Sequence, residues 1–231
     1  LIKDYRTLLG QGVVARFDPE TYSDAVAFAR IGEGSLGGKA RGLAFMNSMI
    51  LKHRLYDKHA NVRIMIPRSV VIATDYFDDF IRLNGLKYII SQEFSDEEIL
   101  SEFVSSTVPA KLQQELKAYI QTVHTPLAVR SSSKLEDSHY QPFAGIYSTY
   151  MIPYVDNGDQ MLRLLLKAVK SVYASVYFAT SRAYLSSSQN LISEEKMAVI
   201  IQEVCGTEQD GLFFPTFSGV ARSINYYPIG D

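Results

Sequence analysis

Short segments rich in Val and Ile alternate along the chain with longer segments whose apolar residues recur every three or four positions. The first pattern predicts strands and the second predicts helices, so the fold has to pack helices against a sheet. The longest periodic segment, 159–185, carries a broad apolar stripe and predicts one core helix. The class is therefore α/β or α+β, with the chain divided between two lobes.

The boundaries of these elements follow from their flanking residues. Ser95 and Glu98 form a capping-box pattern, and Thr74 or Asp75 is expected to cap the helix that follows a strand. Segments 126–131 and 143–154 are expected to pair with each other. The predicted strands are 63–74, 126–131, 143–154, 197–204 and 219–225, and the predicted helices include 24–31, 39–57, 75–84, 99–104 and 109–123.

Composition excludes several classes of protein. The 231 residues, 47% of them hydrophobic, suffice for one large domain or two small ones. A net charge of −2 gives no attraction to polyanions, which disfavours nucleic-acid binding. No segment approaches the ~20 apolar residues that cross a membrane. Cys205 is the single cysteine and no Cys/His cluster has metal-ligand spacing, so we expect a cytoplasmic protein without disulfides or structural zinc.

The segment GEGSLGGK at 32–39 is rich in glycine and ends in a lysine. It matches G-x-G-x-x-G, but a dinucleotide site needs a preceding strand, and 24–31 is predicted to be helical. It also departs from the Walker A pattern, because Ala40 replaces the Ser or Thr that holds magnesium. Two interpretations stay open. Free N–H groups at a helix start, with Lys39 as a point charge, suit a polyphosphate, whereas a plain surface turn would have the same composition.

Arg130 ends an apolar strand, where a guanidinium is costly to bury without an anion. It either pairs with Glu136 or Asp137, or binds phosphate. Gly145 lies in a strand-like run, which is typical of a close approach by backbone or ligand. Thr149, four residues later, would share its face and supply a hydroxyl.

Gln202 and Glu203 close the strand at 197–204, where backbone groups at a strand end could face a purine ring, although this pattern alone is weak. The histidines have no Ser or Cys partner in any recognisable arrangement for nucleophilic catalysis.

Three stretches together resemble the N-terminal nucleotide-binding region of phosphoenolpyruvate synthase and pyruvate phosphate dikinase. They are GGKARGL at 37–43, AVRSSSKLED at 128–137 with FAGIYSTY at 143–150, and MAVIIQEV at 197–204 with FSGVARS at 217–223. The resemblance implies an α+β, ATP-grasp-like domain of two lobes, truncated in the second. Arg-Ser-Ser followed by Glu-Asp and Phe-Ala-Gly is similar to the water-dikinase branch.

The resemblance also assigns roles to residues. Lys39 and Arg130 would hold the ATP phosphates, with Gly37 and Gly38 in the phosphate loop. Gly145 and Thr149 would line the phosphate and ribose side. Gln202, Glu203 and Val204 would lie at the adenine ring.

The same resemblance implies parts that this sequence lacks. The family's ligands for Mg²⁺, its phosphorylatable histidine domain and its pyruvate-binding domain are not recognisable here. We therefore expect a fragment, inactive alone, of an enzyme that makes phosphoenolpyruvate from ATP, pyruvate and water. Its expected parts are a lead-in at 1–23, a first lobe at 24–125, and 126–231 with the central strands and the start of the second lobe. Alternatives are a nucleotide-sensing module without catalysis and a phosphotransferase with another acceptor.

Overall fold

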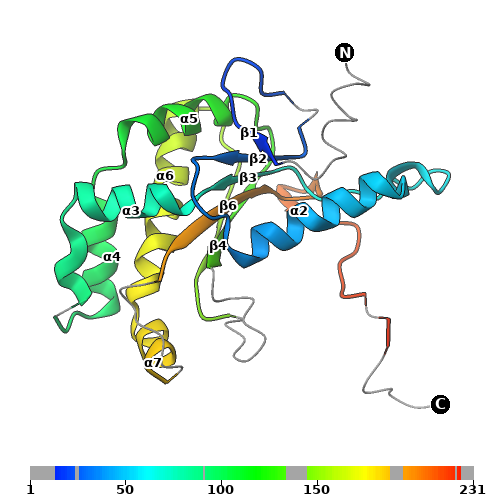
Figure 1. Cartoon of the computed structure of the whole chain (residues 1–231). Coiled ribbons are helices and arrows are strands. Elements are labelled where there is room, and N and C mark those ends of the chain that lie inside the picture. Colours follow the sequence, from blue (N-terminus) through cyan, green and yellow to red (C-terminus); the bar gives the residue numbers. More distant parts are fainter. Residues whose placement is uncertain are drawn as a thin grey trace.

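The computed structural model describes residues 14–23, 26–90, 92–133, 145–187, 195–221 and 223–224. The strands are β1 (Ala15–Arg16), β2 (Phe28–Ile31), β3 (Ser69–Ile72), β4 (Leu127–Ser133), β5 (Thr149–Ile152), β6 (Met197–Glu203), β7 (Thr207–Gln209) and β8 (Leu212–Phe214). The first six form one mixed sheet in the order β1-β2-β3-β6-β4-β5, and β7 and β8 form a separate hairpin (Figure 1). Pairing is parallel among β1, β2 and β3 and antiparallel in the rest of the sheet.

Helices cover both faces of this sheet. They are α2 (Gly37–Lys52), α3 (Thr74–Leu83), α4 (Asp96–Ser105), α5 (Ala110–Ile120), α6 (Gly158–Ala174) and α7 (Ala179–Ser187), with 3₁₀ turns η1 (Leu55–Asp57), η2 (Leu86–Ile90) and η3 (Ser175–Tyr177). Figure 1 shows α2 on one side of the sheet and α3 to α6 on the other. The molecule therefore has helices and a mixed sheet in layers, the α+β arrangement expected from the alternating patterns.

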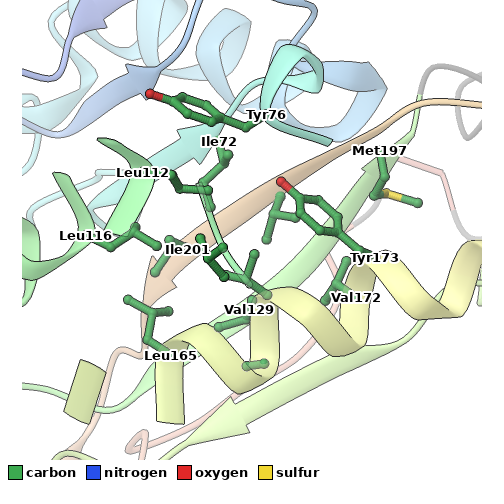
Figure 2. Packing of buried hydrophobic residues seen from close by; sticks show 14 of the residues in the cluster. Ile72, Tyr76, Leu112, Leu116, Val129, Leu165, Val172, Tyr173, Met197 and Ile201 are labelled. Carbon is green, nitrogen blue, oxygen red and sulfur yellow. The ribbon is translucent and has the colours of Figure 1, made fainter. Parts of the chain in front are cut away.

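Alternating side chains of the strands supply a core on each face. On β6, Val199 and Ile201 pack into the large cluster beneath α3 to α6, while Ala198 and Ile200 pack with Ala40 of α2. Figure 2 shows the larger cluster, with residues of α6 facing the strands. Burial on both faces explains why 197–204 is almost continuously apolar.

The prediction of a short helix at 24–31 is wrong, because Phe28–Ile31 form the strand β2. The segment is too short for periodicity to distinguish the two states. Parallel pairing decides between them, since β2 aligns with β3 from Phe28 opposite Ser69 to Ile31 opposite Ile72. The glycine-rich segment thus does follow a strand, so the absence of a preceding strand no longer speaks against a dinucleotide site.

Two long helices were predicted with the wrong ends. The helix expected over 39–57 ends at Lys52, and the helix expected over 159–185 is divided into α6, η3 and α7. The division falls where Ser175 donates its hydroxyl to the carbonyl of Val172, 2.7 Å away, and where Phe178 takes an extended backbone. Such hydroxyl bonds compete with helical bonds and bend the chain.

The other expectations have mixed outcomes. The pairing of the strand predicted at 126–131 with part of 143–154 is confirmed by β4 and β5, and the Ser95–Glu98 capping box is confirmed. The strand predicted at 219–225 is wrong for the described residues, since 219–221 and 223–224 lie outside any strand.

The expected domain boundaries do not coincide with breaks in the sheet. Of the lead-in at 1–23, the described part contains β1, and its Phe17 is 4% exposed in the core. Strands from 24–125 and from 126–231 pair directly through β3 and β6. A two-lobe arrangement stays a proposal, and the described sheet contains strands from both expected lobes.

Candidate functional site: the glycine-rich loop and the end of β4

The glycine-rich loop runs from the end of β2 to the start of α2. Gly32 and Gly37 have φ angles of 91° and 71°, in the left-handed region that favours glycine. The loop therefore turns the chain from the sheet into the first turn of α2, where the positive end of the helix dipole lies.

The start of α3 holds this loop in place. Asp75 accepts a hydrogen bond from the N–H of Glu33 at 2.8 Å, and the Thr74 hydroxyl accepts one from the N–H of Ser35 at 3.0 Å. We expected Thr74 or Asp75 to cap α3, but the N-cap is Ala73, without a side-chain cap bond. The prediction was wrong because both side chains bind a loop about 40 residues away in sequence, as their separations of 39 and 42 show.

The start of α2 rests against the end of β4. The Lys39 Nζ lies 3.1 Å from the Ser131 hydroxyl. Ser132 donates its hydroxyl to the Leu36 carbonyl at 2.8 Å and accepts from the Ala40 N–H at 3.0 Å. Sequence analysis assigned no role to Ser132, because contacts between residues 92 or 96 positions apart leave no local pattern.

Arg130 belongs to a chain of buried polar groups. Its Nη1 donates to Gln202 Oε1 at 3.0 Å. The Gln202 amide then donates to the Ser69 hydroxyl at 3.1 Å, and Ser69 donates to the Pro67 carbonyl at 2.9 Å. The site residues Arg130 and Gln202 are thus in contact, and sequence reasoning missed Ser69.

The two residues expected to pair with Arg130, Glu136 and Asp137, lie outside the described residues. Within the described ranges, no carboxylate forms a salt bridge with Arg130. Its half-buried guanidinium is oriented there by a neutral amide.

Arg130 and Thr149 lie opposite each other on β4 and β5, so both side chains are on the same face of the sheet as α2. The neighbouring Met151 on this face is 61% exposed. Gly145 does not continue the strand as expected but lies in a turn before β5, with a φ of 79°. A Cβ there would meet no atom within 4 Å, so backbone conformation rather than lack of space favours glycine.

Lys39 contacts the residue next to Arg130, but strand alternation assigns Ser131 to the opposite face from Arg130. The Lys39 ammonium of α2 therefore reaches the residue of β4 that follows Arg130. The joint contact of Lys39 and Arg130 with a triphosphate stays a prediction.

Glu203 and Val204 are engaged in structural contacts. The Glu203 carboxylate forms a salt bridge with Arg68 and accepts a hydrogen bond from the Thr125 hydroxyl at 3.3 Å. Arg68 also donates to the Thr122 carbonyl at 2.6 Å. The Val204 N–H donates to the Pro126 carbonyl at 2.9 Å. A role at an adenine ring would therefore use groups other than this carboxylate and this N–H.

Replacing Arg68 by methionine should destabilise the chain by about 3 kcal/mol, because it leaves the Glu203 carboxylate largely buried without its cation. The two side chains are only 12% and 17% exposed. Urea denaturation measures the loss. The matched control is Arg82→Met, since the pair of Arg82 with Asp79 is exposed and should change stability by less than ~1 kcal/mol. Equal stability of both variants would contradict a structural role for the Arg68–Glu203 pair.

The described residues contain no group of three or more His, Cys, Asp or Glu placed to hold a metal ion. Around Arg130 the neighbouring polar groups are an amide and hydroxyls, which do not form the carboxylate-rich set that Mg²⁺ prefers. In the part of the chain that the structure describes, no helix is both long and apolar enough to span a bilayer.

Comparison with known families gives a match to the pyruvate phosphate dikinase AMP/ATP-binding domain over residues 33–229. The chain belongs to this family. The matched range contains the glycine-rich loop, β4 and β6, so the dikinase-domain assignment includes every predicted site residue. It supports ATP binding by a domain of phosphotransferase kind.

Two relatives agree with the dikinase family. An uncharacterized phosphotransferase, YvkC, of Bacillus subtilis is 27% identical over 193 residues, which are 82% of this chain and 20% of the relative. The phosphoenolpyruvate synthase of Aeropyrum pernix is 24% identical over 200 residues, 78% of this chain and 22% of the relative. The chain thus spans about a fifth of the length of these relatives.

Proposed function

We propose that this dikinase domain binds ATP on the α2 face of the sheet. A phosphoryl group of the bound ATP would then pass to a histidine on another domain, for the synthesis of phosphoenolpyruvate from pyruvate. The observation that carries the proposal is the meeting of the α2 start with β4. There Lys39 reaches Ser131, the neighbour of Arg130. A cation on β4 and a second cation that reaches the next residue of the strand suit a chain of phosphates.

Each proposed role follows from the chemistry of the group. Arg130, oriented by Gln202, would hold phosphate oxygens through its remaining donors. Lys39 would add a second positive charge, and both would stabilise negative charge as the phosphoryl group leaves. The N–H of Gly38 would face the phosphates from the first turn of α2, whereas the N–H of Gly37 donates to the Ser35 hydroxyl at 3.3 Å and would hold the loop in shape.

The residues proposed to contact the ribose and the adenine lie along the sheet. Thr149, and Gly145 before it, would line the phosphate and ribose side, while Gln202, Glu203 and Val204 would lie toward the adenine. The described residues do not supply a magnesium site, so its ligands are expected from elsewhere in the protein. The reaction steps proposed for this chain therefore use its cations and hydroxyls alone.

Calorimetric titration of the chain with ATP in the presence of magnesium tests the proposal. We expect saturable one-to-one binding and a rise in melting temperature with ATP concentration, because a ligand that binds only the folded state stabilises it. Inorganic phosphate and pyruvate are the controls and should give neither effect. No binding at about 1 mM ATP, which corresponds to a binding free energy weaker than roughly −4 kcal/mol, would contradict the proposal.

A second measurement addresses the transfer step. The full-length protein, with its histidine domain, should acquire from radiolabelled ATP a phosphoryl label that is lost in acid and kept in base, as expected of phosphohistidine. Binding of ATP without such a label, in a full-length protein that has the histidine domain, would favour the alternative of a nucleotide-sensing module.

A further inference from the structure

The side chain of Ser132 joins two groups of the α2 backbone that lie four residues apart. Its hydroxyl donates to the Leu36 carbonyl and accepts from the Ala40 N–H. These two groups are the i and i+4 partners of the first helical turn, so Ser132 binds at the start of the hydrogen-bond series of α2. Ser132 is 0% exposed, so neither hydrogen bond can be replaced by bulk water.

At the start of α2 the Gly37 N–H donates to the Ser35 hydroxyl at 3.3 Å, which leaves the Leu36 carbonyl and the Ala40 N–H to Ser132. The N-cap residue of α2, Leu36, makes no side-chain cap bond. The close approach also requires glycine at the first helical position, because a Cβ on Gly37 would lie 1.8 Å from the Ser132 carbonyl oxygen. The two hydrogen bonds of the Ser132 hydroxyl and the packing of Gly37 against the Ser132 carbonyl hold the start of α2 against the end of β4.

The two elements in contact, α2 and β4, carry the two cations. Lys39 immediately precedes Ala40 on α2, and Arg130 lies two residues before Ser132 on β4, hence on the same face of the strand. We propose that Ser132 is a positioning residue, which sets where the Lys39 ammonium lies relative to the Arg130 guanidinium and thereby controls affinity for ATP. This inference rests on the proposed function, since it assumes that both cations hold the same ligand.

The proposal predicts coupling between Ser132 and Lys39. Ser132→Ala should weaken ATP binding about tenfold, because a small displacement of a binding group is costly. In a Lys39→Ala background the same substitution should weaken binding less than about twofold, because no ammonium remains to be positioned. Calorimetry on the four proteins of this double-mutant cycle gives both ratios.

Ser171→Ala is the matched control. Ser171 is 3% exposed and donates its hydroxyl to the Lys167 carbonyl at 2.9 Å, within α6 and away from the loop. This substitution also removes one buried hydroxyl, but it should leave ATP affinity unchanged. If Ser132→Ala does not fold, Ser132→Cys, which keeps the shape with a weak donor, replaces it in the cycle.

The outcomes distinguish the positioning role of Ser132 from ATP binding by the chain. Tenfold weakening by Ser132→Ala that disappears in the Lys39→Ala background supports positioning. Unchanged affinity in folded Ser132→Ala, or an equal loss in both backgrounds, overturns the positioning role while ATP binding by the native chain stands. Absence of ATP binding by the native chain overturns the proposed function and this inference with it.

Discussion

In the full-length protein, replacing Arg130 by alanine is expected to abolish ATP-dependent phosphorylation of the histidine and to weaken ATP binding by at least about a hundredfold. The guanidinium is the strongest candidate for a charge-assisted, two-point contact with phosphate, and such contacts are about twice as strong as neutral ones. Lys39→Ala should have a comparable effect on phosphorylation, because it removes the second positive charge that stabilises the negative charge of the phosphoryl group during transfer. Calorimetry with ATP and detection of labelled histidine measure the two losses.

Loss of folding has to be separated from loss of binding. Arg130→Ala leaves the Gln202 Oε1 atom without its donor, which should cost roughly 1–3 kcal/mol of stability. The variant should therefore stay folded but melt at a lower temperature. Arg82→Ala, which removes an exposed arginine from α3, is the control and should keep full binding. Normal labelling in both Arg130→Ala and Lys39→Ala would refute the assignment of the two cations.

Gly37→Ala should be the most destabilising single change in the loop. The added Cβ would lie 1.8 Å from the Ser132 carbonyl oxygen, and the φ of 71° is strained for alanine. The added Cβ would meet backbone atoms of Ser132, which cannot move aside as a side chain can. We therefore expect the free energy of unfolding to fall by on the order of 5 kcal/mol or more, comparable to the whole stability of many domains. Circular dichroism and urea denaturation measure it.

Gly42 in the middle of α2 provides the matched glycine control. A Cβ at this position meets no atom within 4 Å. Gly42→Ala should therefore stabilise the chain by about 0.5–1 kcal/mol through the higher helix propensity of alanine. If Gly37→Ala proved as well tolerated as Gly42→Ala, the close docking of α2 on β4 would be wrong.

Local patterns predicted the elements that local interactions determine. The Ser95–Glu98 capping box could be predicted because its two hydrogen bonds join residues three apart. The strand at 197–204 could be predicted because burial on both faces makes it apolar throughout. The family resemblance assigned ATP contacts to Lys39 and Arg130, which stays a prediction. Arg130 was expected to end its strand, but β4 continues to Ser133, and Lys39 contacts the next residue, Ser131.

Long-range contacts explain what the sequence did not predict. The strand β2 has only four residues, and its state depends on pairing with β3, which is about 40 residues further along the chain. Thr74 was expected to cap a helix, and no role was predicted for Ser132. Their partners, Ser35 and the start of α2, become apparent only once the sheet brings them together.

The amide of Gln202 has a further consequence for how a ligand would arrive. Its oxygen faces Arg130 and its nitrogen faces Ser69, so both ends are engaged and rotation of the amide would break both contacts. Among the described residues Arg130 is thus held without a carboxylate. An incoming anion would meet a guanidinium whose orientation is already set by the Gln202 amide.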